Sequence, residues 1–138
     1  IIYQSRKLLI INDSKSTSFS STLPLLESHK NIFWILGGLA KKDDKIQLKK
    51  KYYQSIKGFI YGKDKSFFAN ALKKKIKIKI NKNLSGSLEE VFKEIKKNLY
   101  EKKVILFSPS AASFDQFKNF EDRGKYFNNI IKKMLKKK

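Results

Sequence analysis

Residues 32–38 read Ile-Phe-Trp-Ile-Leu-Gly-Gly, a short apolar run that stops at two glycines. Such a run is typical of a β-strand buried on both faces, and the glycines predict a turn where the backbone can approach a ligand closely. Similar runs occur at residues 7–11 (KLLII), 58–61 (GFIY) and 104–107 (VILF). Residues 75–80 (KIKIKI) alternate strictly, which predicts a strand near a sheet edge with one face in water.

Two pairs of polar residues predict the starts of helices. Ser87 with Glu90, and Ser113 with Gln116, have the spacing of a capping box, in which each side chain bonds a free backbone N–H of the first turn. The apolar residues that follow recur at helical spacing, so each helix should bury one face. These residues are Leu88, Val91, Phe92, Ile95 and Leu99 in one helix, and Phe114, Phe117, Phe127, Ile130, Ile131 and Met134 in the other.

Three further stretches have a weaker helical pattern. Residues 65–72 predict a short helix, and residues 42–55 are only weakly helical. Residues 18–28 predict another helix, in which Pro24 must mark the start or cause a kink. The alternation of buried strands with helices predicts an α/β fold whose mostly parallel sheet, of about five to six strands, carries helices on both faces.

The composition fits one folded domain and excludes several kinds of site. With 138 residues, 41% of them hydrophobic, the chain can bury one core. The absence of cysteine excludes a disulfide framework, a thiolate metal site and a cysteine nucleophile. No apolar run approaches the roughly 18 residues needed to cross a membrane, and the first residues lack the order of a signal peptide. Because the chain does not begin with Met, we expect it to be a fragment of a longer protein.

The net charge of +20 raises the alternative of a basic nucleic-acid-binding α/β module. Such a module would bind DNA or RNA with an affinity that falls steeply as the salt concentration rises. Only Arg6 and Arg123 among the 32 basic residues are arginine, the residue preferred for bidentate contacts to phosphates and bases. The lysines are spread along the chain, as on a solvated surface, so we expect no specific nucleic-acid partner.

Three segments follow the predicted strands, at the end of a parallel sheet where ligands usually bind. Residues 12–17 (NDSKST) combine an acid, a lysine and three hydroxyls, and residues 37–44 (GGLAKKDD) combine the two glycines with a lysine. Residues 108–113 (SPSAAS) lead toward a helix N-terminus, which can hold a carboxylate or a phosphate. Each segment also has a purely structural explanation, as a polar turn, a tight turn or a helix cap.

Together these segments resemble the Mur ligase family. The third domain of that family carries an Asn-Asp-Ser-Lys-Ala-Thr-Asn turn, matched by residues 12–18, and a Gly-Gly-x-x-Lys turn, matched by residues 37–41. It also carries Ser-Pro-x-x-Ala-Ser-x-Asp-x-Phe-Lys-Asn-Phe-Glu-x-Arg-Gly, matched by residues 108–124. This long segment is typical of the members that add D-glutamate, and the order and spacing agree along almost the whole chain.

The chain departs from the family pattern at a few positions. Ser16 and Ser18 replace the usual alanine and asparagine of the first turn. Ser110 and Ala111 stand where alanine and cysteine are common, so that cysteine cannot be essential in this chain. Lys42 stands where glycine is common, which leaves the shape of the second turn open.

The resemblance implies a Rossmann-like three-layer domain, residues 1–138, that forms the carboxy-terminal, amino-acid-binding part of a cytoplasmic, monomeric ligase. The whole ligase would add D-glutamate to UDP-N-acetylmuramoyl-L-alanine in peptidoglycan biosynthesis, through an acyl phosphate, with release of ADP. ATP and Mg²⁺ would be bound mainly by a central domain, and the uridine nucleotide by a first domain, neither of which lies in this chain. We therefore expect the chain to be inactive alone and to have no membrane partner.

Carried over position by position, the resemblance assigns five residues to D-glutamate. Lys41 would pair with a carboxylate of D-glutamate, while Thr17 and Ser113 would hydrogen-bond it. Phe114 would contribute its backbone N–H, and Phe120 would form an apolar wall.

Two more residues, Asp13 and Lys15, would face the nucleotide across the domain cleft. Asn119 and Arg123 also match the family segment, but their roles beyond holding the helix stay open. No catalytic residue and no metal ligand are expected in this chain. Its single histidine, His29, falls in a helix-to-strand connection and is not expected to act as a general base.

Overall fold

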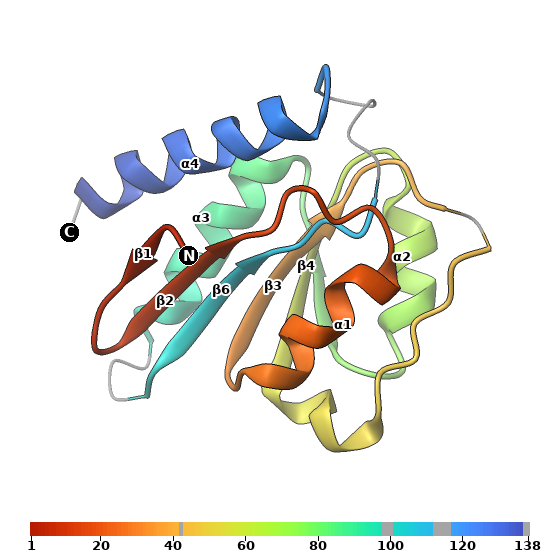
Figure 1. The fold of residues 1–138 in the computed structure, drawn as a ribbon. Coiled ribbons are helices and arrows are strands. Elements are labelled where there is room, and N and C mark those ends of the chain that lie inside the picture. The colour runs from red at the N-terminus through yellow and green to blue at the C-terminus, as the bar shows by residue number, and fades with distance from the viewer. Residues whose placement is uncertain (42, 98–100, 112–116, 137–138) are drawn as a thin grey trace.

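The computed structural model describes residues 1–41, 43–97, 101–111 and 117–136. Its strands are β1 Tyr3–Gln4, β2 Leu8–Asn12, β3 Ile32–Gly37, β4 Ile56–Tyr61, β5 Lys77–Ile80 and β6 Lys103–Phe107. They form one sheet with the order β1-β2-β6-β3-β4-β5 (Figure 1). The short strand β1 pairs antiparallel with β2, and all the other neighbouring strands are parallel.

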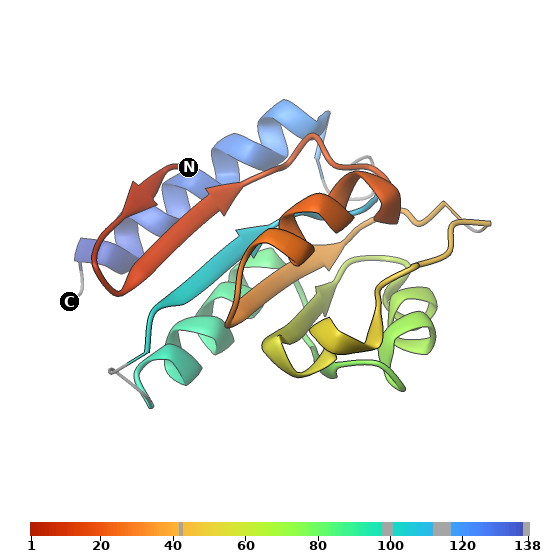
Figure 2. The ribbon, with the colours of Figure 1, turned by 60° about the horizontal axis from the view of Figure 1, so that its bottom comes forward.

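Helices cover both faces of this sheet (Figures 1 and 2). They are α1 Phe19–Ser28, the 3-10 helix η1 Lys50–Ser55, α2 Lys65–Leu72, α3 Leu84–Ile95 and α4 Phe120–Lys136. Successive side chains of a strand point to opposite faces, so Trp34 and Leu36 join the apolar core under α1 and α2, while Ile35 joins the core under α3 and α4. The three-layer α/β fold predicted from the sequence is confirmed.

The edge strand β5 has the half-exposed character that its alternating sequence predicted. Its residues are exposed or half-buried, whereas all five residues of β6 in the middle of the sheet are buried. It begins at Lys77, two residues later than predicted, and Ile76 before it is buried in the core with α2. Lysines on an edge strand hinder pairing with another chain, which gives this part of the positive charge a structural purpose.

The capping box predicted at Ser87 and Glu90 is wrong, because α3 begins one turn earlier. Asn83 is the N-cap, and its side-chain oxygen accepts a hydrogen bond from the backbone N–H of Gly86 at 2.8 Å. Ser87 is buried inside the helix, where its hydroxyl donates to the Asn81 side chain at 3.0 Å. The second predicted box, at Ser113 and Gln116, lies outside the described residues, and the described helix α4 begins at Phe120.

Pro24 lies inside α1 and does not mark its start. The helix begins after Ser18, whose hydroxyl accepts a hydrogen bond from the backbone N–H of Ser21 at 3.3 Å. The helix then continues past Pro24 to Ser28, although a proline removes one intrahelical hydrogen bond. The early N-cap therefore sets the helix start.

The weak helix predicted over residues 42–55 is mostly wrong. In the described part of this segment only η1 is helical, and residues 44–49 are irregular. Leu48 is buried and Ile46 packs against the same core. These two apolar side chains thus hold the connection against the core, although the segment that carries them is not helical.

The turn after β3 requires glycine, as its sequence predicted. Gly37 has φ +143° and Gly38 has φ +126°, a backbone region that other residues rarely adopt. A Cβ atom on Gly37 would also overlap the carbonyl oxygen of Tyr61 in the neighbouring strand β4. Both glycines therefore let the chain leave the sheet tightly at its carboxyl end.

Replacement of Gly37 by alanine should destabilise the chain by at least about 3 kcal/mol, because the new methyl group has neither space nor an accessible backbone conformation. Urea unfolding followed by circular dichroism measures this loss. Gly86→Ala is the matched control, since its Cβ would meet only ordinary contacts in the first turn of α3, and it should be neutral or stabilise by up to about 1 kcal/mol. Equal unfolding midpoints for the two variants would contradict this account.

Candidate functional site

The three segments singled out by the sequence begin side by side at one edge of the sheet. Asn12 ends β2, Phe107 ends β6 and Gly37 ends β3, and these strands are neighbours in the sheet (Figure 1). The backbone N–H of Asp13 donates to the carbonyl of Phe107 at 2.7 Å, and that of Gly37 donates to the carbonyl of Pro109 at 3.0 Å. The segments are therefore hydrogen-bonded to each other where they leave the strands.

The structure describes only some of the residues predicted to bind D-glutamate, namely Thr17, Lys41 and Phe120. Thr17 and Lys41 are exposed, on the segments after β2 and β3. Phe120 is the first residue of α4, and 43% of its surface is exposed although it is a large aromatic residue. Ser113 and Phe114 lie outside the described residues, so the structure does not test their predicted roles.

The two residues predicted to face the nucleotide lie in the segment after β2. Lys15 is exposed, whereas Asp13 is half-buried and accepts a hydrogen bond from the hydroxyl of Ser108 at 2.8 Å. This bond joins the first segment to the third. The carboxylate of Asp13 is thus held in one orientation by a neighbour that the sequence did not pair with it.

A cluster of buried hydroxyls lies directly behind these segments. The hydroxyl of Thr22, on α1, is 2.7 Å from each of the hydroxyls of Ser16, Ser108 and Ser110. Thr22 has no exposed surface. Sequence reasoning missed Thr22, because one threonine within a helical pattern gives no signal of its long-range partners.

The buried guanidinium of Arg123 makes a second connection between the first and third segments. Arg123 is only 1% exposed. Its Nη2 donates to the carbonyl of Ser14 at 2.6 Å, its Nη1 to the carbonyl of Ala111 at 2.9 Å, and its Nε to the hydroxyl of Ser14 at 3.2 Å. Since a buried charge is stable only when hydrogen-bonded, these acceptors hold Arg123 and Arg123 holds the two backbones.

Helix α4 is docked on the first segment by further polar contacts. The Asn12 side-chain amide donates to the carbonyl of Gly124 at 3.0 Å and to the side chain of Asn128 at 2.7 Å. A Cβ on Gly124 would lie 3.1 Å from the Cβ of Ser14, so glycine permits this close approach. Asn119 caps the helix by accepting from the backbone N–H of Asp122 at 2.8 Å, so it holds the start of α4.

Two carboxylates anchor the second segment, which carries Lys41. The carboxylate of Asp44 accepts from the backbone N–H of Phe19, at the start of α1, at 2.7 Å. The carboxylate of Asp64 accepts from the backbone N–H of Ala40, also at 2.7 Å. The backbone beside Lys41 is therefore held from both sides while its ammonium group stays exposed.

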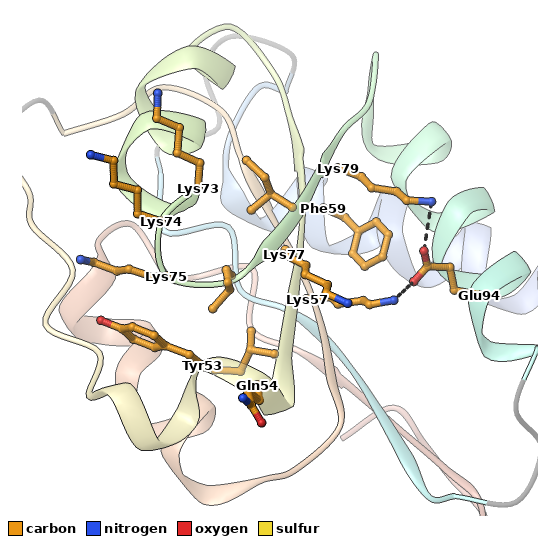
Figure 3. A pocket seen from close by; sticks show the side chains of 14 residues that line it. Tyr53, Gln54, Lys57, Phe59, Lys73, Lys74, Lys75, Lys77, Lys79 and Glu94 are labelled. Atoms are coloured by element: carbon orange, nitrogen blue, oxygen red, sulfur yellow. Dashed lines mark hydrogen bonds and ion pairs between the residues drawn. The ribbon is translucent and has the colours of Figure 1, made fainter.

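A hollow of about 880 Å³ lies away from these segments, beside the amino ends of β4 and β5 (Figure 3). Glu94 lies at its wall and is bonded by the ammonium groups of Lys57 at 2.9 Å and Lys79 at 3.0 Å. Burial alone would raise the pKa of Glu94, but the hydrogen bonds and charges of these two lysines hold that pKa below its usual value. The lysines on the wall are Lys57, Lys73, Lys74, Lys75, Lys77 and Lys79, and no residue predicted to bind substrate is among them.

Among the described residues there is no group of three His, Cys, Asp or Glu side chains that could hold a metal ion. In the same part of the chain, no helix is long and apolar enough to cross a membrane.

The structure predicts that Arg123→Lys lowers the free energy of unfolding by about 2–4 kcal/mol. Lysine keeps the positive charge but lacks the rigid fork that bonds Ser14 and Ala111 together. Urea unfolding measures the loss, with Arg6→Lys as the control because Arg6 is exposed and its replacement should change stability by less than about 0.5 kcal/mol. If both variants unfolded at the wild-type urea concentration, the guanidinium would not have the structural role assigned to it.

Comparison with known proteins identifies the family. No model of a protein family matches the chain. The chain is 39% identical over 123 residues to the UDP-N-acetylmuramoylalanine–D-glutamate ligase of Rickettsia prowazekii. The aligned region covers 88% of this chain and 27% of that protein. It is 36% identical over 127 residues to the enzyme of the same name from the Wolbachia of Brugia malayi, covering 92% of this chain and 25% of that protein.

A relative of the same name from Hydrogenobaculum is 37% identical over 126 residues, covering 90% of this chain and 29% of that protein. The chain thus spans about a quarter of the length of the curated relatives that it matches. The chain belongs to the Mur ligase family, where it corresponds to the carboxy-terminal domain of the UDP-N-acetylmuramoylalanine–D-glutamate ligases.

Proposed function

We propose that this chain holds the incoming D-glutamate in the ATP-dependent ligase that joins it to UDP-N-acetylmuramoyl-L-alanine. The observation that carries the proposal is the convergence of three matching segments at the carboxyl edge of one parallel sheet. Ligands of such sheets bind at this edge. The relatives are named as D-glutamate ligases, which supports D-glutamate as the amino acid.

The chemistry of D-glutamate fits the groups in these segments. The amino acid has two carboxylates and one amine, so a site for it needs a cation and hydrogen-bond donors. Lys41 supplies an exposed ammonium group, and Thr17 supplies an exposed hydroxyl. Phe120 offers an exposed ring for the apolar methylene groups. Ser113 and Phe114 complete the proposed set with a hydroxyl and a backbone N–H.

In the proposed reaction the carboxylate of UDP-N-acetylmuramoyl-L-alanine first takes the terminal phosphoryl group of ATP, and ADP leaves. The neutral amine of D-glutamate then attacks the carbonyl carbon of this acyl phosphate. A C–N bond forms, the C–O bond to phosphate breaks, and the amine loses a proton. The role of this chain is to hold the amine in position and to close over ATP, which lowers the entropic cost of the attack.

Two residues of the first segment are proposed to face the nucleotide. Asp13 is held by Ser108 next to the exposed Lys15, so an acceptor and a cation lie close together in the sequence. The described residues contain no group of three His, Cys, Asp or Glu side chains that could hold a metal ion, and no step is assigned to Mg²⁺. In the proposed ligase the central domain would hold most of the ATP and Mg²⁺.

His29 does not fit the role of general base in this arrangement. It is the C-cap of α1, next to the amino end of β3. The proposed site lies at the carboxyl end of the same strand, and a six-residue strand is roughly 20 Å long. We propose that the whole ligase acts as a monomer in the cytoplasm, in peptidoglycan biosynthesis, and that another part of it accepts the proton.

In the complete ligase, Lys41→Ala should raise the KM for D-glutamate by about tenfold or more, with a smaller change in kcat. Loss of one charge-assisted contact to a carboxylate has this size, and it weakens substrate and transition-state binding alike. Steady-state kinetics with varied D-glutamate measure both constants. Lys74→Ala is the control, since Lys74 lines the hollow near β5 and its loss should leave KM unchanged. An unchanged KM for D-glutamate in the Lys41→Ala ligase would contradict the proposed binding site.

The isolated 138-residue chain should form no amide from ATP, UDP-N-acetylmuramoyl-L-alanine and D-glutamate. Measurable amide formation by the isolated chain would contradict the purely positioning role.

A further inference from the structure

The buried hydroxyl of Thr22 lies at the centre of contacts between the first and third segments. Three other hydroxyls, those of Ser16, Ser108 and Ser110, lie 2.7 Å from it. The Ser108 hydroxyl makes one more contact, at 2.8 Å, to the carboxylate of Asp13. All of these serines and Thr22 are buried.

The carboxylate of Asp13 determines the direction of every hydrogen bond in this cluster. An ionised carboxylate only accepts, so the single hydroxyl proton of Ser108 must point to Asp13. Ser108 can then only accept from Thr22, and this uses the single hydroxyl proton of Thr22. The two lone pairs of Thr22 remain, and they accept from Ser16 and Ser110.

The two outer donors are Ser16 in the first segment and Ser110 in the third. Both bond the same oxygen of Thr22. Both also have longer alternatives. The Ser16 hydroxyl is 3.0 Å from that of Ser21 and 3.4 Å from the carbonyl of Ser18, and the Ser110 hydroxyl is 3.3 Å from the carbonyl of Ser108. The hydroxyls of Ser16 and Ser110 are therefore additional to a central Thr22–Ser108–Asp13 connection.

We propose that Thr22 is a positioning residue for the D-glutamate and nucleotide sites. Its hydroxyl fixes residues 12–17, which carry Thr17, against residues 108–111, and it orients the Asp13 carboxylate through Ser108. Because Thr22 is fully buried, it acts only through these neighbours and touches no substrate. This inference rests on the proposed function, since it assigns to Thr22 an effect on D-glutamate affinity.

The test compares four variants of the chain in D-glutamate titrations followed by ¹H–¹⁵N NMR. Thr22→Val keeps the shape of the side chain but removes the hydroxyl, and Thr22→Ser restores a hydroxyl at the same place. Val91→Ala is the matched control, because Val91 is fully buried in the core under α3 and lies in a different cluster from Thr22. The double variant Ser16→Ala/Ser110→Ala removes only the outer donors.

We expect Thr22→Val to weaken D-glutamate binding by about tenfold, the effect of one lost buried hydrogen bond on the geometry that it holds. Thr22→Ser should bind within about threefold of wild type, and the double variant likewise, because the central connection remains. Val91→Ala should lower the unfolding midpoint but leave the affinity unchanged. If Thr22→Val were destabilised like Val91→Ala and bound D-glutamate as wild type does, the positioning role would be overturned.

A failure of the proposed function gives a different result. If the wild-type chain bound no D-glutamate at any concentration, the assignment of the site to this chain alone would fail. The backbone signals would still decide the inference about Thr22. A connected cluster requires Thr22→Val to shift the amide signals of both Asp13 and Ser110, while a shift confined to the signals of α1 would contradict the connection.

Discussion

At the carboxyl edge of the sheet, the guanidinium of Arg123 bonds the carbonyls of Ser14 and Ala111 from inside the protein. A buried cation destabilises the folded state unless its donors find acceptors. Moving either carbonyl away from the guanidinium would therefore cost free energy. The two segments that leave β2 and β6 are consequently held at fixed positions relative to each other. The proposed D-glutamate contacts depend on this constraint, because they come from different segments.

The order of the strands explains why the constraint is needed at this place. The chain crosses the sheet in one direction from β2 through β3 and β4 to β5, and then returns to place β6 between β2 and β3. Segments distant in the sequence therefore meet at this edge. Backbone hydrogen bonds end with the strands, and polar side chains must continue the connection. Thr22 and Arg123 do so from two sides, with α1 and α4 as their supports.

The sequence alone predicted those features of the fold that have a local pattern. Buried strands show as apolar runs, and the turn at Gly37 shows as two glycines because the backbone there has positive φ. The start of α3 was misplaced because two polar signals lay four residues apart, and Asn83 rather than Ser87 meets the free N–H groups. The partners of Arg123 lie 12 and 109 residues away in the chain, and Ser108 and Ser110 lie 86 and 88 residues from Thr22. Contacts between residues so far apart leave no periodic pattern in the sequence.

The largest gathering of positive charge on this molecule does not coincide with the proposed site. The lysine-lined hollow lies near the exposed edge strand β5, where several lysines face solvent and two neutralise Glu94. The exposed Lys41 lies in the segment after β3, on a backbone held by Asp44 and Asp64. Because ordering of protein groups on binding costs free energy, a cation on a backbone that is already fixed suits a small dicarboxylate.

The central claim is that D-glutamate binds at the carboxyl edge and not in this hollow. Intermolecular nuclear Overhauser effects between ¹³C-labelled D-glutamate and the chain test it most directly. The account predicts contacts from the ligand methylene protons to the methyl group of Thr17 and the ring of Phe120. Contacts to the ring of Tyr53 and the side chain of Ile78, which line the hollow, would contradict it.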